Sequence, residues 1–222
     1  MNLRSLVSEF LGTAILVAVV IGSGIMATNL STDVGVQLLI NTISTIFALY
    51  ILIELLAPLG GAHFNPVVSG AALILKKISL QNFIAYIFVQ FAGGFVGAVL
   101  ANLMFGHVAV EQSTRIRTGG SLFLSEVVAT AGLVFIIFSA LALLKDEKIP
   151  LLVSLWIGSA YLFTSSTSFA NPAVTFARSW SESFAGIALE SVPLFIAAQL
   201  LGGLLGLWLC LSLFPQLRKV AK

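Results

Sequence analysis

The chain has 222 residues, of which 59% are hydrophobic and 9% are charged, whereas about a quarter of the residues in an ordinary soluble domain are charged. Because a membrane-spanning helix takes about 20 apolar residues, this composition leaves room for about six spans and excludes enzymes that need a domain outside the membrane. The net charge of +2, without a long basic run, excludes a nucleic-acid partner.

Six apolar segments are long enough to cross a membrane. The first begins after Arg4, contains Glu9 and continues to about Thr28 without a cleavage-site pattern, so we interpret it as a retained helix. The other five lie at about residues 34–57, 80–105, 121–144, 150–167 and 185–214. Two further apolar segments, at residues 66–75 and 172–180, are too short to span, which predicts re-entrant helices.

Lysine and arginine are distributed unevenly between the two sides of this arrangement. Cytoplasmic loops collect Lys and Arg. An orientation with both termini in the cytoplasm leaves only Arg115, Arg117 and Arg178 on the outer side. The cations that it places inside are Arg4, Lys76, Lys77, Lys145, Lys148, Arg218, Lys219 and Lys222. The sequence therefore predicts an integral membrane protein with an even number of spans.

Three motifs occur twice, in the same order. Ser-Glu-x-x-x-Thr-Ala lies at residues 8–14 and 125–131, Asn-Pro-x-Val at 65–68 and 171–174, and Gln-x-x-Gly-Gly-x-x-Gly at 90–97 and 199–206. Because each half, residues 1–109 and 110–222, holds three spans, the second copy must enter the membrane from the opposite side. The predicted fold is all-α, with six transmembrane helices and two re-entrant half-helices in an inverted three-helix repeat.

An Asn-Pro pair opens each short segment. Asn is a preferred N-cap and Pro suits the first helical position, so the half-helices are expected to begin at Asn65 and Asn171. If each Asn oxygen accepts a backbone N–H of its own helix, the side-chain NH2 is left as a free donor. Two such donors would meet near mid-membrane, where each half-helix N-terminus carries about half a positive charge. The pattern predicts a narrow pore for neutral, hydrogen-bonding solutes.

With these features the sequence resembles the aquaporin and glycerol-channel family, the major intrinsic proteins, over essentially its whole length. The family's paired Asn-Pro-Ala motifs read here as Asn65-Pro66-Val67 and Asn171-Pro172-Ala173. The resemblance implies a passive channel for water and small neutral, glycerol-like solutes, without a cofactor, assembled as a homotetramer in the lipid bilayer. It also implies that the added methyl groups of Val67 tighten the packing where the half-helices meet.

Residues 167–175 are similar to the bacterial branch of this family that is found beside arsenic-resistance genes. That similarity adds arsenite and methylated arsenicals to the solutes that the resemblance implies. It also implies that the membrane is a bacterial inner membrane.

The resemblance carries over four positions of the family's outer selectivity constriction. By spacing from the motifs they are Thr45, Tyr161, Ser168 and Val174, with Phe169 as the alternative to Ser168. Val174 stands where family members have arginine, and Thr45 where water-selective members have a bulky aromatic, which implies a broader and less polar pore. Arg178 lies one turn along the same helix face. It either presents its guanidinium to the outer vestibule or snorkels to the interface.

Glu9, Glu126 and His63 are ionisable side chains in or beside the predicted membrane segments. Glu9 and Glu126 are repeated in the two halves, and the resemblance implies that they accept hydrogen bonds from the re-entrant loops, with a proton relay as the alternative. His63 is either a gate or a hydrogen-bonding member of its loop. Because the sequence has only two histidines and one cysteine, we expect no metal site.

A secondary transporter is the alternative function, because inverted repeats and broken helices that meet at the midplane are typical of transporters as well. The small size of the chain argues against it. A coupled carrier should also place an acid or a cation site at the midplane, where this sequence has the neutral Asn65 and Asn171. An intramembrane enzyme is excluded because the sequence offers no nucleophile with a plausible base partner.

Overall fold

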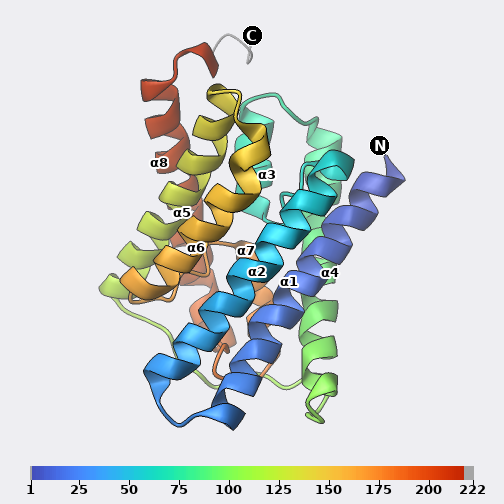
Figure 1. Cartoon of the computed structure of the whole chain (residues 1–222), viewed down its shortest axis with the longest axis vertical. Helices are drawn as coiled ribbons and strands as arrows, with labels where there is room; N and C mark the ends of the chain where they lie inside the picture. The colour runs from blue at the N-terminus through green and yellow to red at the C-terminus, as the bar shows by residue number, and fades with distance from the viewer. Residues whose placement is uncertain (1, 218–222) are drawn as a thin grey trace.

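The computed structural model describes residues 2–217, and over that range the chain is helical, without a β-strand. The α-helices are α1 Leu3–Leu30, α2 Val34–Gly60, α3 Pro66–Ile74, α4 Leu80–Met104, α5 Gly120–Ala142, α6 Ile149–Phe163, α7 Pro172–Arg178 and α8 Val192–Leu213. Short 3-10 turns, Asp146–Lys148 and Leu189–Ser191, precede α6 and α8. Six long helices thus surround the half-helices α3 and α7 (Figure 1). This is the predicted fold class.

The ends of two predicted spans are wrong. The fifth ends at Phe163 instead of 167, which leaves α6 with 15 residues, and five of the other helices have the length and composition to cross a membrane. The chain leaves α6 early because it must turn into the loop before α7. The last span begins at Val192 instead of 185. Ala185 and Ile187 are apolar because they are fully buried against the protein, not because they lie in a spanning helix.

Short polar residues and a glycine account for several helix boundaries. The Asp33 side chain accepts a hydrogen bond from the Val36 N–H at 3.0 Å, and Ser79 accepts one from the Asn82 N–H at 3.2 Å. These are the N-cap contacts that begin α2 and α4. The last turn of α2 ends at Gly61, whose φ of +91° lies in the left-handed region that glycine adopts without a steric penalty.

The two halves of the chain pack in the same way. Helix α1 lies against α4 and α5 against α8, while each half-helix contacts the last long helix of the other half, α3 against α8 and α7 against α4. In Figure 1, α1 leads away from the end that carries both chain termini, and α5 leads toward it. The second half is therefore inverted relative to the first.

Glycines of the repeated Gln-x-x-Gly-Gly-x-x-Gly motif set the distance between the paired long helices. A Cβ atom added at Gly97 of α4 would collide with the backbone oxygen of Ala14 in α1. At the equivalent place in the second half, a Cβ at Gly206 of α8 would collide with the backbone oxygen of Ala131 in α5. Small residues that let helix backbones approach are typical of helix pairs in lipid.

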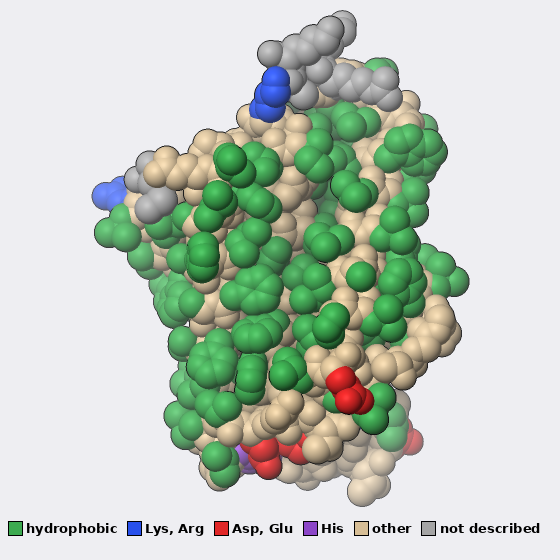
Figure 2. All heavy atoms as spheres, turned by 180° about the vertical axis from the view of Figure 1, so that it is seen from behind, with side chains coloured by type: hydrophobic (Ala, Val, Ile, Leu, Met, Phe, Trp, Pro, Cys, Tyr) green, Lys and Arg blue, Asp and Glu red, His purple; other side chains and the backbone are tan. Residues whose placement is uncertain are grey.

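The outer faces of the long helices are apolar. Figure 2 shows hydrophobic side chains between the two ends of the molecule, with Lys and Arg at the end that carries the termini and acidic side chains toward the opposite end. Large hydrophobic residues such as Phe88 and Trp208 are 72% and 61% exposed. An apolar surface of this extent is that of a protein embedded in lipid. Three of the predicted cytoplasmic cations, Arg218, Lys219 and Lys222, lie outside the described residues.

Val67, the departure from the Asn-Pro-Ala motif, packs against α8. A Cβ atom added at Gly203 of α8 would collide with the Cγ1 atom of Val67. The Val67 side chain belongs to a buried cluster with Val134, Phe138 and Leu207. One of the added methyl groups, Cγ1, therefore occupies the space that Gly203 leaves open, and the tightening between the half-helices stays a prediction.

We expect Gly203→Ala to destabilise the protein by about 1–3 kcal/mol, because the new methyl group overpacks against Val67. In a Val67→Ala background the same change should cost much less, since the two positions share one space. The midpoint of thermal unfolding in detergent measures both. Gly120→Ala is the control, because a Cβ at Gly120 meets no neighbour within 4 Å. Equal losses in the two backgrounds would contradict the packing.

Candidate functional site

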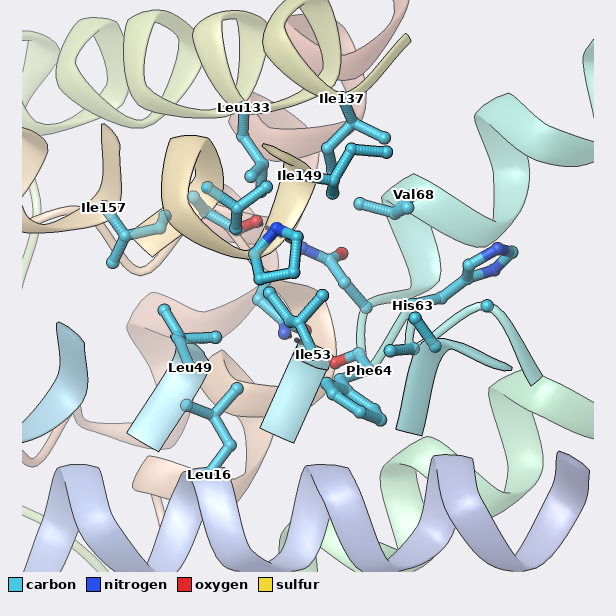
Figure 3. A pocket seen from close by; sticks show the side chains of 18 of the residues that line it. Leu16, Leu49, Ile53, His63, Phe64, Val68, Leu133, Ile137, Ile149 and Ile157 are labelled. Carbon is cyan, nitrogen blue, oxygen red and sulfur yellow. Dashed lines mark hydrogen bonds between the residues drawn. The ribbon is translucent and has the colours of Figure 1, made fainter. Parts of the chain in front are cut away.

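One cavity of about 630 Å³ lies within the bundle. Its lining includes Lys77 and Asp146, from the loops at the end that carries the termini, and Asn65 and Asn171 at the start of the half-helices. It also includes Arg178, at the end of α7. Figure 3 shows that much of its wall is aliphatic, with side chains from α1, α2, α5 and α6 that point toward a common centre. Those labelled are Leu16, Leu49, Ile53, Leu133, Ile137, Ile149 and Ile157.

Asn65 and Asn171 cap their own half-helices with their side-chain oxygens. The Asn65 oxygen accepts from the Val67 N–H at 2.9 Å, and the Asn171 oxygen accepts from the N–H groups of Ala173 and Val174 at 3.0 and 3.3 Å. Pro66 and Pro172 occupy the first helical positions, where a missing N–H leaves no bond unmade.

The amide groups of the two asparagines link the halves of the chain crosswise. Asn65 Nδ2 donates to the carbonyl of Ala170, and Asn171 Nδ2 donates to the carbonyl of Phe64, both at 2.7 Å. We expected both NH2 groups to be free, and this is wrong for one hydrogen of each group. The loop of each half places a carbonyl beside the asparagine of the other half. A side-chain amide carries two N–H bonds. The second of each is left for the cavity that both residues line.

The loops before the two asparagines share an unusual backbone. Ala62 and Phe64, and at the same offsets in the second half Ser168 and Ala170, all have φ of +48°. A non-glycine residue in this left-handed region costs about 1–3 kcal/mol and persists only where its surroundings enforce it. Such strain is typical of functional sites, so both loops are candidates for one.

Glu9 holds the first strained loop. Its carboxylate is fully buried and accepts from the backbone N–H groups of His63 and Phe64 at 2.7 Å each. The Gln90 amide donates to the same carboxylate at 2.8 Å. Hydrogen bonds of this kind to a charged acceptor are stronger than those between neutral groups.

Glu126 holds the second loop in the same way. It is fully buried, and its oxygens accept from the backbone N–H groups of Phe169 and Ala170 at 2.9 Å. The Ser166 hydroxyl and the Gln199 amide donate to it at 2.6 and 2.7 Å. The glutamine of the repeated Gln-x-x-Gly-Gly-x-x-Gly motif therefore supports the buried acid in each half. The sequence alone did not predict this role, although the repetition of these glutamines was a signal.

His63 has contacts of its own within the first loop. Its Nδ1 lies 3.0 Å from the Ser69 hydroxyl, and its ring meets the Tyr86 ring edge-on with 5.5 Å between centroids. In Figure 3 the imidazole points away from the aliphatic centre of the cavity. These contacts favour a hydrogen-bonding member of the loop over a gate. Among the described residues, no group of three His, Cys, Asp or Glu side chains could hold a metal ion.

The four positions expected at the constriction line the same cavity. They are Thr45 from α2, Tyr161 from α6, Ser168 from the second loop and Val174 from α7, and Phe169 lines it as well. The Thr45 hydroxyl donates to the Asn41 carbonyl at 2.8 Å and lies 3.4 Å from the Tyr161 hydroxyl. Tyr161 therefore occupies space beside the small side chain of Thr45.

Arg178 lies in the wall of the cavity, which disfavours the snorkelling alternative. It is 2% exposed and lines the cavity, whereas a snorkelling side chain would place its charge in water. Its Nε donates to the Ala185 carbonyl, and its Cζ lies 3.4 Å from the centroid of the Phe169 ring. The spacing of four residues from Val174 was the signal for this placement, because it sets both side chains on one helix face.

Residues 1–170 match the family model described as major intrinsic protein. The chain is 43% identical over 222 residues to "Aquaglyceroporin AqpS" of Rhizobium meliloti (strain 1021), covering 98% of this chain and 95% of the relative. It is 30% identical over 195 residues to a "Probable aquaporin TIP-type" of Medicago truncatula, covering 81% and 77%. The fold is similar to the X-ray structure of the aquaglyceroporin from Plasmodium falciparum, with a TM-score of 0.74 and 20% identity over 99% of this chain and 100% of that one.

Proposed function

Because the chain belongs to the major intrinsic protein family, we propose that the cavity between its two halves is the pore of a channel. The protein is a passive membrane channel for water and small neutral solutes, and not an enzyme. The proposal concerns which residues form its pore and which solutes it takes.

The observation that carries the pore assignment is the crosswise pairing of Asn65 and Asn171. Each asparagine uses its oxygen and one hydrogen within the protein, and both side chains line the cavity. The remaining N–H groups can donate to a solute oxygen at a place where the walls are otherwise aliphatic. Such a pore favours single small molecules that carry acceptor oxygens.

We propose glycerol-like polyols as solutes besides water. The relative that is 43% identical carries the name of an aquaglyceroporin, and the aliphatic wall of the cavity suits the carbon face of a polyol. Arsenite and methylated arsenicals follow as candidates from the resemblance to the arsenic-resistance branch. Arsenite is uncharged at neutral pH and, like glycerol, carries three hydroxyl groups.

The proposed setting is a homotetramer in a bacterial inner membrane, with both termini in the cytoplasm. The described cations at the terminus end of the molecule support this orientation, and the similar AqpS protein is bacterial. We further propose that residues 1–109 and 110–222 are the two repeat units. Helices α1–α4 fall in the first and α5–α8 in the second.

The hydrogen bonds that the buried carboxylates of Glu9 and Glu126 accept argue against a secondary transporter. Glu9 accepts from three protein donors and Glu126 from four. Oxygens that are engaged in this way are poorly placed to bind and release a coupling ion.

Stopped-flow light scattering on proteoliposomes tests the channel. We expect water and glycerol permeability well above that of empty vesicles, linear in solute concentration and independent of ion gradients, because no conformational cycle limits the flux. Arsenite uptake is measured in the same vesicles. Glycerol flux that saturates or requires an ion gradient would establish the transporter instead, and water flux without glycerol flux would remove polyols from the solute class.

A further inference from the structure

Three arginines converge on one segment at the end of the molecule opposite the termini. Arg115 Nη1 donates to the Phe184 carbonyl at 3.0 Å, and Arg117 Nε donates to the Gly186 carbonyl at 2.8 Å. Arg178 Nε donates to the carbonyl of Ala185, between them. Because all three acceptors are neutral backbone carbonyls, these hydrogen bonds hold the guanidinium groups in place without cancelling their charge.

Of these arginines, only Arg178 is part of the cavity lining. Phe169 supports its guanidinium from one side, and the Arg117 Cζ lies 5.1 Å from the centroid of the same ring. The Nη1 atom of Arg178 is buried and has no hydrogen-bond partner in residues 2–217. An unpaired buried donor is costly, and more so when it is charged. Because Arg178 lines the pore, an oxygen atom of a passing solute can accept this hydrogen bond.

A second polar group near Arg178 also lacks a partner. The hydroxyl of Ser168 is buried and unpaired within the described range, and it lines the same cavity. The hydroxyl pair of Thr45 and Tyr161 lines it too. Three residues with hydroxyl groups and one with a charged donor therefore line the cavity together with the apolar Val174.

We propose that Arg178 is the cation of the outer constriction, supplied from one helical turn beyond the position that Val174 occupies. Its charge excludes cations, and its Nη1 donates to an acceptor oxygen of small, uncharged, hydroxylated solutes as they pass. A fixed positive charge in a narrow pore of low polarity repels cations strongly. This proposal rests on the channel function proposed above and names the residue that sets its charge selectivity.

Urea and guanidinium form a probe pair for this proposal, because they are planar, similar in size and different in charge. We expect wild-type proteoliposomes to take up urea and exclude guanidinium. Arg178→Gln keeps a donor that can reach Ala185 but removes the charge, so it should raise guanidinium flux by about tenfold or more relative to urea. Arg178→Lys keeps the charge and should keep the exclusion.

Two further variants separate the pore charge from a structural role. Arg115→Gln removes a charge from the same carbonyl cluster but outside the cavity lining, and it should leave guanidinium excluded. Val174→Arg in the Arg178→Gln background moves the cation back by one turn on the same face, and it should restore exclusion. A merely structural arginine would not be replaced by one at another position.

The proposal is overturned if folded Arg178→Gln protein excludes guanidinium as the wild type does, or if Arg115→Gln admits it equally. It is also overturned if the wild type itself conducts guanidinium, a result that needs no variant to fold. Failure of the channel function has a different signature, because wild-type vesicles would then take up neither water nor urea faster than empty ones.

Discussion

Glu126→Ala should abolish production of folded protein. The substitution leaves four buried donors, from Ser166, Phe169, Ala170 and Gln199, without their acceptor. At about 1–3 kcal/mol for each unsatisfied buried group, the summed loss of about 4–12 kcal/mol is comparable with the whole stability of a typical protein, about 5–15 kcal/mol. The strained loop before Asn171 would also lose the contacts that hold its left-handed residues. Size-exclusion chromatography of detergent-solubilised protein and water flux per reconstituted protein measure the effect.

Glu126→Gln should be intermediate, because an amide supplies one acceptor oxygen and turns an NH2 group toward donors. Glu9→Ala should repeat the effect of Glu126→Ala, since Glu9 supports the first loop in the same way. Glu190→Ala, at an exposed acid in the turn before α8, is the control and should behave as the wild type. A stable, monodisperse Glu126→Gln protein with abolished flux would support the proton-relay interpretation instead.

Asn171→Asp should lower the flux of neutral solutes by about tenfold or more, because it removes the N–H that donates to the Phe64 carbonyl and sets a carboxylate oxygen against that carbonyl. Two acceptor oxygens at hydrogen-bond distance repel, and a buried charge without a partner typically costs several kcal/mol. The new negative charge should also admit cations. Asn65→Asp should act in the same way through the carbonyl of Ala170.

Asn102→Asp is the control for this prediction. The Asn102 amide is also buried and donates to the carbonyls of Ala109 and Trp180, but it does not line the cavity. Its substitution should lower the yield of folded protein while leaving the flux per folded channel unchanged. Equal neutral flux through wild-type and Asn171→Asp channels would remove the two asparagines from the pore.

Local patterns in the sequence were sufficient for most of the fold. Runs of apolar residues fixed the spans because each long helix must face lipid along its own length, and Asn65-Pro66 and Asn171-Pro172 fixed the start of the half-helices because capping is a contact within a few residues. The ends at Phe163 and Val192 were missed, since apolar residues that are buried under a loop look the same in sequence as residues that face lipid.

Contacts between distant segments explain what the sequence did not disclose about the site. The acceptor of the Asn65 amide is 105 residues away, and the space filled by Val67 is left by a glycine in the last helix. The spacing from Val174 predicts the helix face on which Arg178 lies. The burial of its side chain, however, depends on the carbonyl of Ala185 and the ring of Phe169. Neither contact belongs to a local motif.

The crosswise bonds of the asparagines also constrain how the protein is made. The amide of Asn65 donates to a carbonyl that lies 105 residues further along the chain. At a synthesis rate of about 5–20 residues per second, this carbonyl is made roughly 5–20 s after Asn65. Over that time the first four helices have entered the bilayer with an incomplete polar loop inside them. Water or the insertion machinery must solvate that loop until the second half arrives. The pore therefore cannot form before the second half is made, and a product that ends between the halves has no channel.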